Sequence, residues 1–219
     1  MNRFDSAIAA VIPSVKQALL GTSPANLSEA DLRRELVACV LGSQVRFETA
    51  VSALDKLKTA GLLKCSWWRK IKDEGFEREV YDCLSRGYRF PRARAKQLAG
   101  ARDALAKKSL TIRLSEGVSP RAMRVDLIDA IPGLGPKQAS MFLRNIGWSV
   151  ELAILDTHVL RFMELKQLLT TAPNNIGSIA GYERAEHIAI KYADSYGEPV
   201  GYVDVAIWAT MRAAAELHL

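Results

Sequence analysis

Apolar residues recur at intervals of three and four positions along almost the whole chain, which is the pattern of helices with one buried face. In one segment, for example, Leu32, Leu36, Val37, Val40 and Leu41 share such a face. The pattern predicts helices over approximately 28–41, 47–60, 76–86, 91–108, 120–130, 136–146, 157–169, 180–195 and 199–216. No long run alternates apolar and polar positions as a strand does, so the sequence predicts an all-α fold.

Helix start and stop signals support these boundaries. Ser28 and Asp31 form a capping-box pattern at the start of the first predicted helix, and Gly61 follows the second. Pro91 stands at a first helical position, where proline is tolerated. The loops between helices are short and contain Gly and Pro, as expected for a compact helical protein.

The most informative segment spans residues 120–147. One predicted helix ends near Ile131, a Pro-Gly-Leu-Gly turn follows, and Pro136 opens the next helix. Gly133 and Gly135 permit a tight turn with unusual φ angles. The segment therefore predicts two helices joined by a short hairpin.

The second helix of this hairpin carries a lysine in its first turn. Ala139, Phe142, Leu143 and Ile146 form an apolar stripe that faces inward. Lys137 lies off this stripe, so we expect it to face a cleft or a ligand.

A helix N-terminus behind a Gly-rich hairpin offers backbone N–H groups and a positive dipole end, which together suit a phosphate without sequence preference. The same dipole disfavours a charged amine and so increases the neutral, nucleophilic fraction of Lys137. Two interpretations follow from the hairpin alone. Lys137 is either a nucleophile or a residue that only pairs with a DNA phosphate.

Asp156 favours the catalytic interpretation. It precedes a predicted helix that begins at Thr157, where an N-cap aspartate is common. A carboxylate held by helix N–H groups stays ionised and rigid. Beside a sugar that is losing its base, it would stabilise the developing oxocarbenium charge.

Composition narrows the class of protein. A chain of 219 residues with 30 Lys and Arg against 24 Asp and Glu carries a net charge of +6, which fits a polyanionic partner. Cys39, Cys65 and Cys83 are scattered and odd in number, which argues against a disulfide framework and against a four-cysteine metal or iron–sulfur site. The first sixteen residues contain Asp5 and no long apolar core, so we expect no signal peptide there. No uncharged apolar run approaches the length needed to span a bilayer.

The hairpin with Lys137, followed by Leu155-Asp156-Thr157-His158, resembles the helix-hairpin-helix DNA glycosylases that act through a Schiff base. The resemblance is greatest to the small archaeal and bacterial branch of the 8-oxoguanine DNA glycosylase/AP lyases. Three further segments are similar to that branch, namely the basic stretch 87–102, the second hairpin helix 137–147 and the final helix around 203–208. The resemblance runs from about Ser28 to the C-terminus.

The resemblance implies an all-α, two-lobed fold with a central cleft and no iron–sulfur cluster. The whole chain would form one glycosylase domain, with lobe 1 at approximately 1–45 plus 157–219 and lobe 2 at approximately 46–156. The helix-hairpin-helix at about 120–147 would belong to lobe 2.

The resemblance also implies roles for individual residues. Lys137 would attack the sugar, expel the base and drive β-elimination, and Asp156 would assist. Gly133, Gly135 and His158 would lie at the DNA backbone. No cofactor is implied apart from a structural monovalent cation at the backbone carbonyls of Asp129, Ile131 and Leu134, which would strengthen the grip on phosphate.

Further residues resemble those that extrude and recognise the base. Phe90 would wedge into the stack, Arg89 would reach the orphaned base and Gln44 would fill the vacated space. Trp208 would stack on the flipped base, and Asp204 lies on the same helical face. Phe90 and Trp208 can instead be ordinary core aromatics, and a buried Asp204 would need a partner, either the base or a neighbouring helix end.

The basic run around the wedge fits contacts with phosphates. It includes Arg92 and Arg94, although a solvated helix face would produce the same composition. Trp67 and Trp68 lie beside Arg69 and Lys70 and either pack at an interface between the lobes or meet DNA.

The sequence therefore predicts a bifunctional DNA repair enzyme, a glycosylase and AP lyase that excises 8-oxoguanine from damaged duplex DNA. We expect a monomer without membrane attachment that acts at the nucleoid in a prokaryotic cytoplasm. Two alternatives stay open: the same chemistry on a different modified purine, and a non-catalytic helix-hairpin-helix DNA-binding module. The chain ends in Leu219, whereas the archaeal members compared end in a lysine that helps to read the damaged base.

Overall fold

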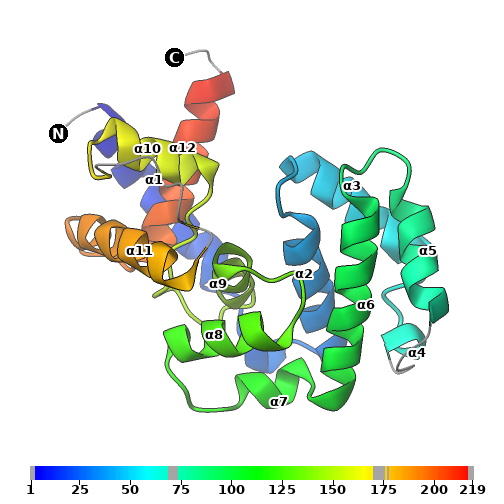
Figure 1. The fold of residues 1–219 in the computed structure, drawn as a ribbon. Helices are drawn as coiled ribbons and strands as arrows, with labels where there is room; N and C mark the ends of the chain where they lie inside the picture. The colour runs from blue at the N-terminus through cyan, green and yellow to red at the C-terminus, as the bar shows by residue number, and fades with distance from the viewer. Residues whose placement is uncertain (1–2, 69–73, 170–175, 177, 217–219) are drawn as a thin grey trace. The chain divides into compact units, whose positions relative to one another are not determined.

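The structure is a computed structural model that describes residues 3–68, 74–169, 176 and 178–216. Every regular element within these ranges is a helix, which confirms the predicted all-α class (Figure 1). The elements are α1 (Arg3–Leu19), the 3-10 helix η1 (Pro24–Asn26), α2 (Glu29–Leu41), α3 (Phe47–Thr59), α4 (Cys65–Trp68), α5 (Glu74–Leu84), α6 (Pro91–Lys107), α7 (Leu110–Leu114), α8 (Pro120–Ala130), α9 (Pro136–Asn145), α10 (Thr157–Leu165), α11 (Ile179–Asp194) and α12 (Val200–Glu216). None of these helices is long and apolar enough to cross a membrane.

Most predicted helix boundaries lie within one or two residues of the observed ones, because the caps act as expected. At α2 the Ser28 hydroxyl accepts from the Asp31 N–H, while the Asp31 carboxylate accepts from the Ser28 N–H. The predicted helix over 157–169 was too long, since α10 ends at Leu165. Gln167 adopts a left-handed conformation with φ of 55°, which reverses the chain although apolar positions continue.

The chain divides into two compact units. Unit 1 comprises residues 1–23 and 143–219, and unit 2 comprises residues 24–142. The sequence placed the divisions near residues 45 and 156. The first observed division is earlier because α2 packs against α3, α6 and α7 of unit 2. The second is earlier because the segment Leu152–Leu155 lies among the buried residues of unit 1.

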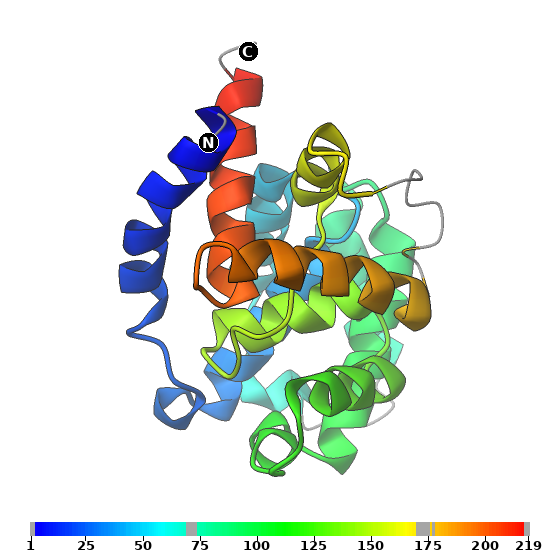
Figure 2. The same ribbon diagram turned by 90° about the vertical axis from the view of Figure 1, so that its left-hand side faces the viewer.

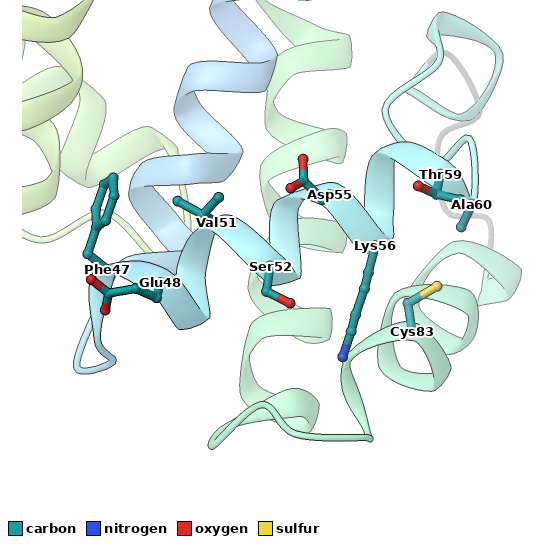
Figure 3. A pocket seen from close by; sticks show the side chains of 9 residues that line it. All are labelled: Phe47, Glu48, Val51, Ser52, Asp55, Lys56, Thr59, Ala60 and Cys83. Carbon is teal, nitrogen blue, oxygen red and sulfur yellow. The ribbon is translucent and has the colours of Figure 1, made fainter.

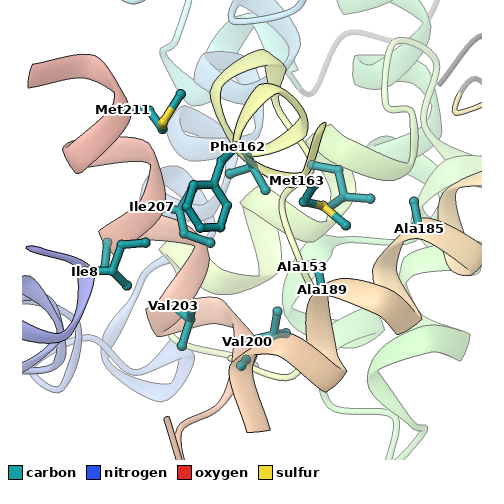
Figure 4. Close-up of a cluster of buried hydrophobic side chains, with 14 of the residues drawn as sticks. Ile8, Ala153, Phe162, Met163, Ala185, Ala189, Val200, Val203, Ile207 and Met211 are labelled. Carbon is teal, nitrogen blue, oxygen red and sulfur yellow. The ribbon is translucent and has the colours of Figure 1, made fainter. Parts of the chain in front are cut away.

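The core of unit 1 lies where α1, α10 and α11 pack against α12 (Figures 2 and 4). Helix α1 lies alongside α12 and contributes Ile8, which is fully buried. Phe162 from α10 and Ile207 from α12 fill the centre, and Ala153 brings the segment before α10 into the same cluster. This core supports the helix that begins after Asp156.

The core of unit 2 forms where α6 packs against α2, α4 and α5, while α3 packs against α2 and α5, and α7 against α2 (Figure 1). Trp68 is buried here, donates its indole N–H to the Leu62 carbonyl at 3.0 Å and meets the edge of Phe76. Trp67 also contacts the Phe76 ring, with 6.0 Å between centroids. Both tryptophans therefore pack against Phe76 within unit 2.

Candidate active site

The hairpin between α8 and α9 is built from one glycine with a positive φ angle and from close packing. Gly133 has φ of 94°, a conformation that residues with a side chain rarely adopt. A Cβ atom at Gly133 would lie 3.1 Å from both Gln97 Cβ and Val40 Cγ1. Gly135 does not share the positive φ, so the predicted unusual conformation holds for Gly133 alone.

Two further contacts fix the hairpin within unit 2. Pro132 lies against Gly100 of α6, where an added Cβ would come within 2.9 Å of the proline Cγ. Arg124 of α8 is completely buried and donates to the Ser140 hydroxyl of α9 at 3.3 Å. The turn is therefore held on α6 and across its own two helices.

Lys137 occupies the first turn of α9 as predicted and is half-buried. Ala139, Phe142 and Leu143 are completely buried and Ile146 is 1% exposed, which confirms the predicted apolar stripe. Lys137 lies off that stripe, at the helix end where backbone N–H groups point toward the turn.

Asp156 is the N-cap of α10. One of its oxygens, Oδ1, accepts from the His158 N–H at 2.9 Å and from the Val159 N–H at 2.8 Å. The predicted capping role is thus confirmed, and the half-buried carboxylate is fixed relative to the helix. His158 lies in the first turn of α10 and is half-buried.

Asp204 is 2% exposed and finds its partners within the protein. Its Oδ1 accepts from the Arg144 guanidinium at 2.9 Å and its Oδ2 accepts from the Ile154 N–H at 2.6 Å. Burial raises the pKa of Asp204 to about 7, although the Arg144 charge and the Ile154 N–H act in the opposite direction. Both oxygens are thus engaged without a ligand, while base recognition by Asp204 stays a prediction.

Trp208 lies one turn after Asp204 on α12. It is half-buried, and the Arg212 guanidinium lies 5.4 Å from its ring centroid. It is therefore neither a fully enclosed core residue nor a freely exposed one.

Arg89, Phe90 and Gln44 occupy two loops of unit 2. Arg89 is exposed, and its guanidinium lies 4.9 Å from the ring centroid of Phe90, which is half-buried just before α6. Gln44 is exposed in the turn after α2 and has φ of 61°. An exposed non-glycine residue in this conformation is uncommon and marks a turn that its surroundings hold in place.

Arg94 holds this turn in place. The sequence predicted a phosphate contact for Arg94, and its buried position corrects that prediction. It is 6% exposed, and its guanidinium donates to the Ser43 carbonyl at 2.7 Å, to the Tyr88 hydroxyl at 3.3 Å and to Gln97 Oε1 at 2.6 Å. Tyr88 in turn donates to the Leu41 carbonyl at 2.5 Å. Arg94 thereby connects the Gln44 turn with the loop that carries Arg89 and Phe90.

The basic run thus contains two kinds of residue. Arg92 is exposed, with its guanidinium 5.4 Å from the Tyr81 ring, and stays a candidate for phosphate contact. Arg102 is 1% exposed and pairs with Asp103 at 2.8 Å. A regular spacing of arginines did not reveal which of them point into the protein.

The backbone groups named for a monovalent cation lie at the end of α8 and in the hairpin. The Ile131 carbonyl accepts from the Leu134 N–H at 3.3 Å, which leaves one of its lone pairs for another partner. Backbone carbonyl oxygens are ligands of the kind that a monovalent cation takes, and the cation itself stays a prediction. Within the described residues, no group of three or more His, Cys, Asp or Glu side chains could hold a metal ion.

A separate hollow of about 810 Å³ lies on α3 of unit 2 (Figure 3). Its lining includes Phe47, which is 63% exposed, and Lys56, whose ammonium donates to the Arg86 carbonyl at 2.7 Å. Cys83 closes one end from α5. None of the predicted site residues lines this hollow.

The predicted residues fall into two groups, one in each unit. Unit 2 holds the hairpin with Lys137 and the supported loops of Gln44, Arg89 and Phe90. Unit 1 holds Asp156, His158, Asp204 and Trp208. Sequence reasoning missed Tyr88 in the first group, and Tyr182 and Glu186 in the second, because a buried hydroxyl or carboxylate has no periodic pattern of its own.

Helices α8 and α9 with their glycine turn form a helix-hairpin-helix, a class of motif suited to gripping a nucleic-acid backbone through a helix N-terminus. The chain belongs to the 8-oxoguanine DNA glycosylase family, whose model matches residues 21–198.

Individual relatives agree with this assignment. The 8-oxoguanine DNA glycosylase/AP lyase of Sulfurisphaera tokodaii is 32% identical over 179 residues, which cover 80% of this chain and 79% of the relative. The crystal structure of the 8-oxoguanine DNA glycosylase of Thermotoga maritima has 29% identity and a TM-score of 0.76, covering 94% of this chain and 92% of that one. The Methanocaldococcus jannaschii 8-oxoguanine glycosylase/lyase in complex with a 15mer DNA containing 8-oxoguanine has a TM-score of 0.70 at 22% identity, with 94% and 90% coverage, and shows the same fold.

Proposed function

We propose that this protein excises 8-oxoguanine from duplex DNA and cuts the strand at the same site, with Lys137 as the nucleophile and Asp156 as the assisting carboxylate. The protein is an 8-oxoguanine DNA glycosylase with AP lyase activity. The observation that carries the assignment of Lys137 is its position in the first turn of α9, directly after the glycine hairpin.

Lys137 acts in its neutral form. Its amine attacks C1′ of the damaged nucleotide, and the bond between C1′ and the base breaks with the electron pair leaving on the base, which takes up a proton. Opening of the sugar ring with loss of the amine proton gives an imine between Lys137 and C1′. Removal of a C2′ proton then expels the 3′ phosphate and cuts the strand, and water finally releases the lysine.

Asp156 supports the first of these steps. Positive charge develops on the sugar as the base departs, and an ionised carboxylate beside it stabilises that charge. Because the Asp156 carboxylate already accepts two N–H groups of α10, little reorientation is needed during the reaction. Lys137 and Asp156 belong to different units, and we propose that they act on the same nucleotide.

The hairpin holds the DNA backbone beside the lesion. The turn at Gly133 and Gly135 lets a phosphate approach the N–H groups at the start of α9, and His158 meets a neighbouring phosphate. A monovalent cation at the carbonyl oxygens of Asp129, Ile131 and Leu134 would add positive charge at the same place.

The damaged nucleotide must leave the helix before Lys137 can reach it. Phe90 wedges into the stack, Arg89 contacts the orphaned base and Gln44 occupies the vacated space, which together offset an unstacking cost of a few kcal/mol. Trp208 stacks on the extruded base. Support from Arg94 on both loops favours this assignment, because a wedge works only when its backbone is rigid.

Borohydride reduction tests the mechanism, because it converts the lysine imine to a stable secondary amine. The wild-type protein with a duplex containing a single 8-oxoguanine should give a covalent adduct. Lys137→Gln should give none. Lys58→Gln removes an exposed lysine of α3 and should react as the wild type does.

The same experiment decides between the alternatives. Tight DNA binding without an adduct on 8-oxoguanine or on an abasic site would establish a non-catalytic module. An adduct with another modified purine but not with 8-oxoguanine would establish the same chemistry on a different base. Leu219 lies outside the described residues. We further propose that the protein acts as a monomer, at the nucleoid in the cytoplasm.

A further inference from the structure

The segment directly before Asp156 is bound in an unusual way. Three consecutive backbone N–H groups, those of Ala153–Leu155, donate to side chains and not to other backbone groups. The acceptors are, in order, a carboxylate oxygen of Glu186 at 3.0 Å, a carboxylate oxygen of Asp204 at 2.6 Å and the hydroxyl of Tyr182 at 3.1 Å. We call these three side chains the backbone clamp.

The clamp is buried throughout. Glu186 is 0% exposed, Tyr182 1% and Asp204 2%, and every residue of the segment Leu152–Leu155 is buried as well. Tyr182 binds the segment twice, because its hydroxyl also donates to the Ala153 carbonyl at 2.7 Å. The buried segment therefore has hydrogen-bond partners that a sheet or helix would ordinarily supply.

Burying a loop against carboxylate side chains costs free energy. Transfer of a carboxylate into a protein interior carries a desolvation penalty of several kcal/mol, and apolar packing would avoid it. Arg144 neutralises the Asp204 carboxylate directly, through a contact of 2.9 Å. A costly buried arrangement of this kind points to a geometric requirement on the segment that it holds.

The segment leads directly to the carboxylate that assists catalysis. The Asp156 N–H donates to the Ile154 carbonyl at 3.0 Å, so the Ile154 residue is held at its N–H by Asp204 and at its carbonyl by Asp156. Asp156 then caps α10. A continuous path of hydrogen bonds thus runs from α11 and α12 to the backbone of Asp156.

We propose that Tyr182, Glu186 and Asp204 are positioning residues, which hold the Asp156 carboxylate in the geometry that base release requires. This role rests on the proposed function of Asp156. It also gives Asp204 a task other than contact with the base. Misplacement of a reacting group by about 1 Å can lower a rate about 100-fold, so modest loosening of the clamp should be measurable.

Tyr182→Phe is the sharpest test, because it removes the hydroxyl and keeps the ring. We expect the single-turnover rate of 8-oxoguanine release to fall at least 10-fold, while affinity for the duplex stays unchanged. Borohydride trapping on a preformed abasic site should fall much less, because no base has to be expelled there. Tyr202→Phe removes another hydroxyl of unit 1 outside the clamp and should react as the wild type does.

Glu186 provides a second, independent variant. Glu186→Gln keeps an oxygen that can accept from the Ala153 N–H, whereas Glu186→Ala does not, so Gln should retain most of the base-release rate that Ala loses. Both comparisons are made on protein whose cooperative unfolding shows that it is folded. This variant also decides the matter if Tyr182→Phe does not fold.

The proposal is overturned if folded Tyr182→Phe releases the base at the wild-type rate, or if it loses base release and abasic-site trapping equally. Equal rates in Glu186→Gln and Glu186→Ala would overturn it too. Failure of the proposed function is a different result, since the wild-type protein itself would then give no adduct on any substrate.

Discussion

Asp156 combines two requirements in a single side chain. Its Oδ1 caps α10, and its negative charge would stabilise the positive charge that develops on the sugar as the base departs. Asparagine is about as good an N-cap as aspartate but carries no charge. Asp156→Asn should therefore separate the two roles.

For Asp156→Asn we expect base release to slow by about 100-fold or more, the scale of losing one electrostatic contact in an active site. The free energy of unfolding should change by less than about 1 kcal/mol, because the cap is retained. Single-turnover kinetics and urea unfolding measure the two quantities. A large loss of stability with unchanged base release would show that Asp156 is only a cap.

Asp204 predicts a distinct dependence of stability on pH. Burial raises its pKa from 3.8 to about 7, against the charge of Arg144 and with a smaller contribution from the negative charge of Asp156. Between about pH 4 and 7 the folded protein therefore retains a proton that the unfolded chain has released. This group stabilises the fold fully below pH 4 and loses that contribution as the pH rises through 7.

The test compares the unfolding free energies of the wild type and of Asp204→Asn at each pH. The contributions of all other titrating groups cancel in the difference between the two proteins. That difference should decrease from pH 4 to 7, by roughly 4 kcal/mol at most, and then level off. Urea unfolding at several pH values measures it. A constant difference, or one that increases with pH, would contradict the raised pKa.

Residues whose roles depend on local sequence were predictable, and residues whose roles depend on burial were not. The capping role of Asp156 follows from a helix start next to it in the chain. The inward orientation of Arg94 depends on the Ser43 carbonyl and Tyr88, which other elements bring to it. Tyr182 belongs to the clamp only because α11 packs beside the segment before Asp156.

At the scale of elements, the hairpin shows how packing restricts a turn. Helix boundaries could be predicted because capping groups and prolines act within a few residues of the boundary. Gly133 could be predicted as a turn residue for the same reason. Its close approach to Gln97 and Val40 could not, because that depends on how α2 and α6 pack.

Gly133→Ala should destabilise the protein in two ways. Its φ of 94° is unfavourable for alanine, and the new Cβ would press on Gln97 and Val40 at 3.1 Å. We expect a loss of about 2–4 kcal/mol from strain and overpacking together, with weaker DNA binding because the hairpin shifts.

Gly197→Ala is the matched control. Gly197 also has a positive φ, of 67°, but no atom lies within 4 Å of an added Cβ. It should show the strain of about 1–3 kcal/mol alone, with unchanged DNA affinity. Urea unfolding and DNA titration compare the two variants. Equal effects in both would mean that packing around the hairpin contributes nothing.

At the scale of the whole molecule, the net charge of +6 is that of a protein that meets a polyanion. Not all of the cationic side chains can reach DNA, because Arg94, Arg102 and Arg124 are buried. Composition could predict the class of partner but not the residues that meet it. Exposure within the fold divides the basic side chains into candidates for phosphate contact and supports of the structure.

The dependence of DNA affinity on salt concentration tests this division. Each phosphate neutralised by a cationic side chain contributes about 0.9 to the slope of log K against log salt concentration for duplex DNA. Arg92→Gln should reduce the magnitude of that slope by about 1 and leave the unfolding free energy nearly unchanged, because Arg92 is exposed.

Arg94→Gln should leave the slope unchanged and lower the unfolding free energy by about 1–3 kcal/mol, because the Ser43 carbonyl and the Tyr88 hydroxyl lose a partner. DNA titrations at several salt concentrations, with urea unfolding of the same samples, separate the two outcomes. A reduced slope for Arg94→Gln would return Arg94 to the DNA-binding surface, and an unchanged slope for Arg92→Gln would remove Arg92 from it.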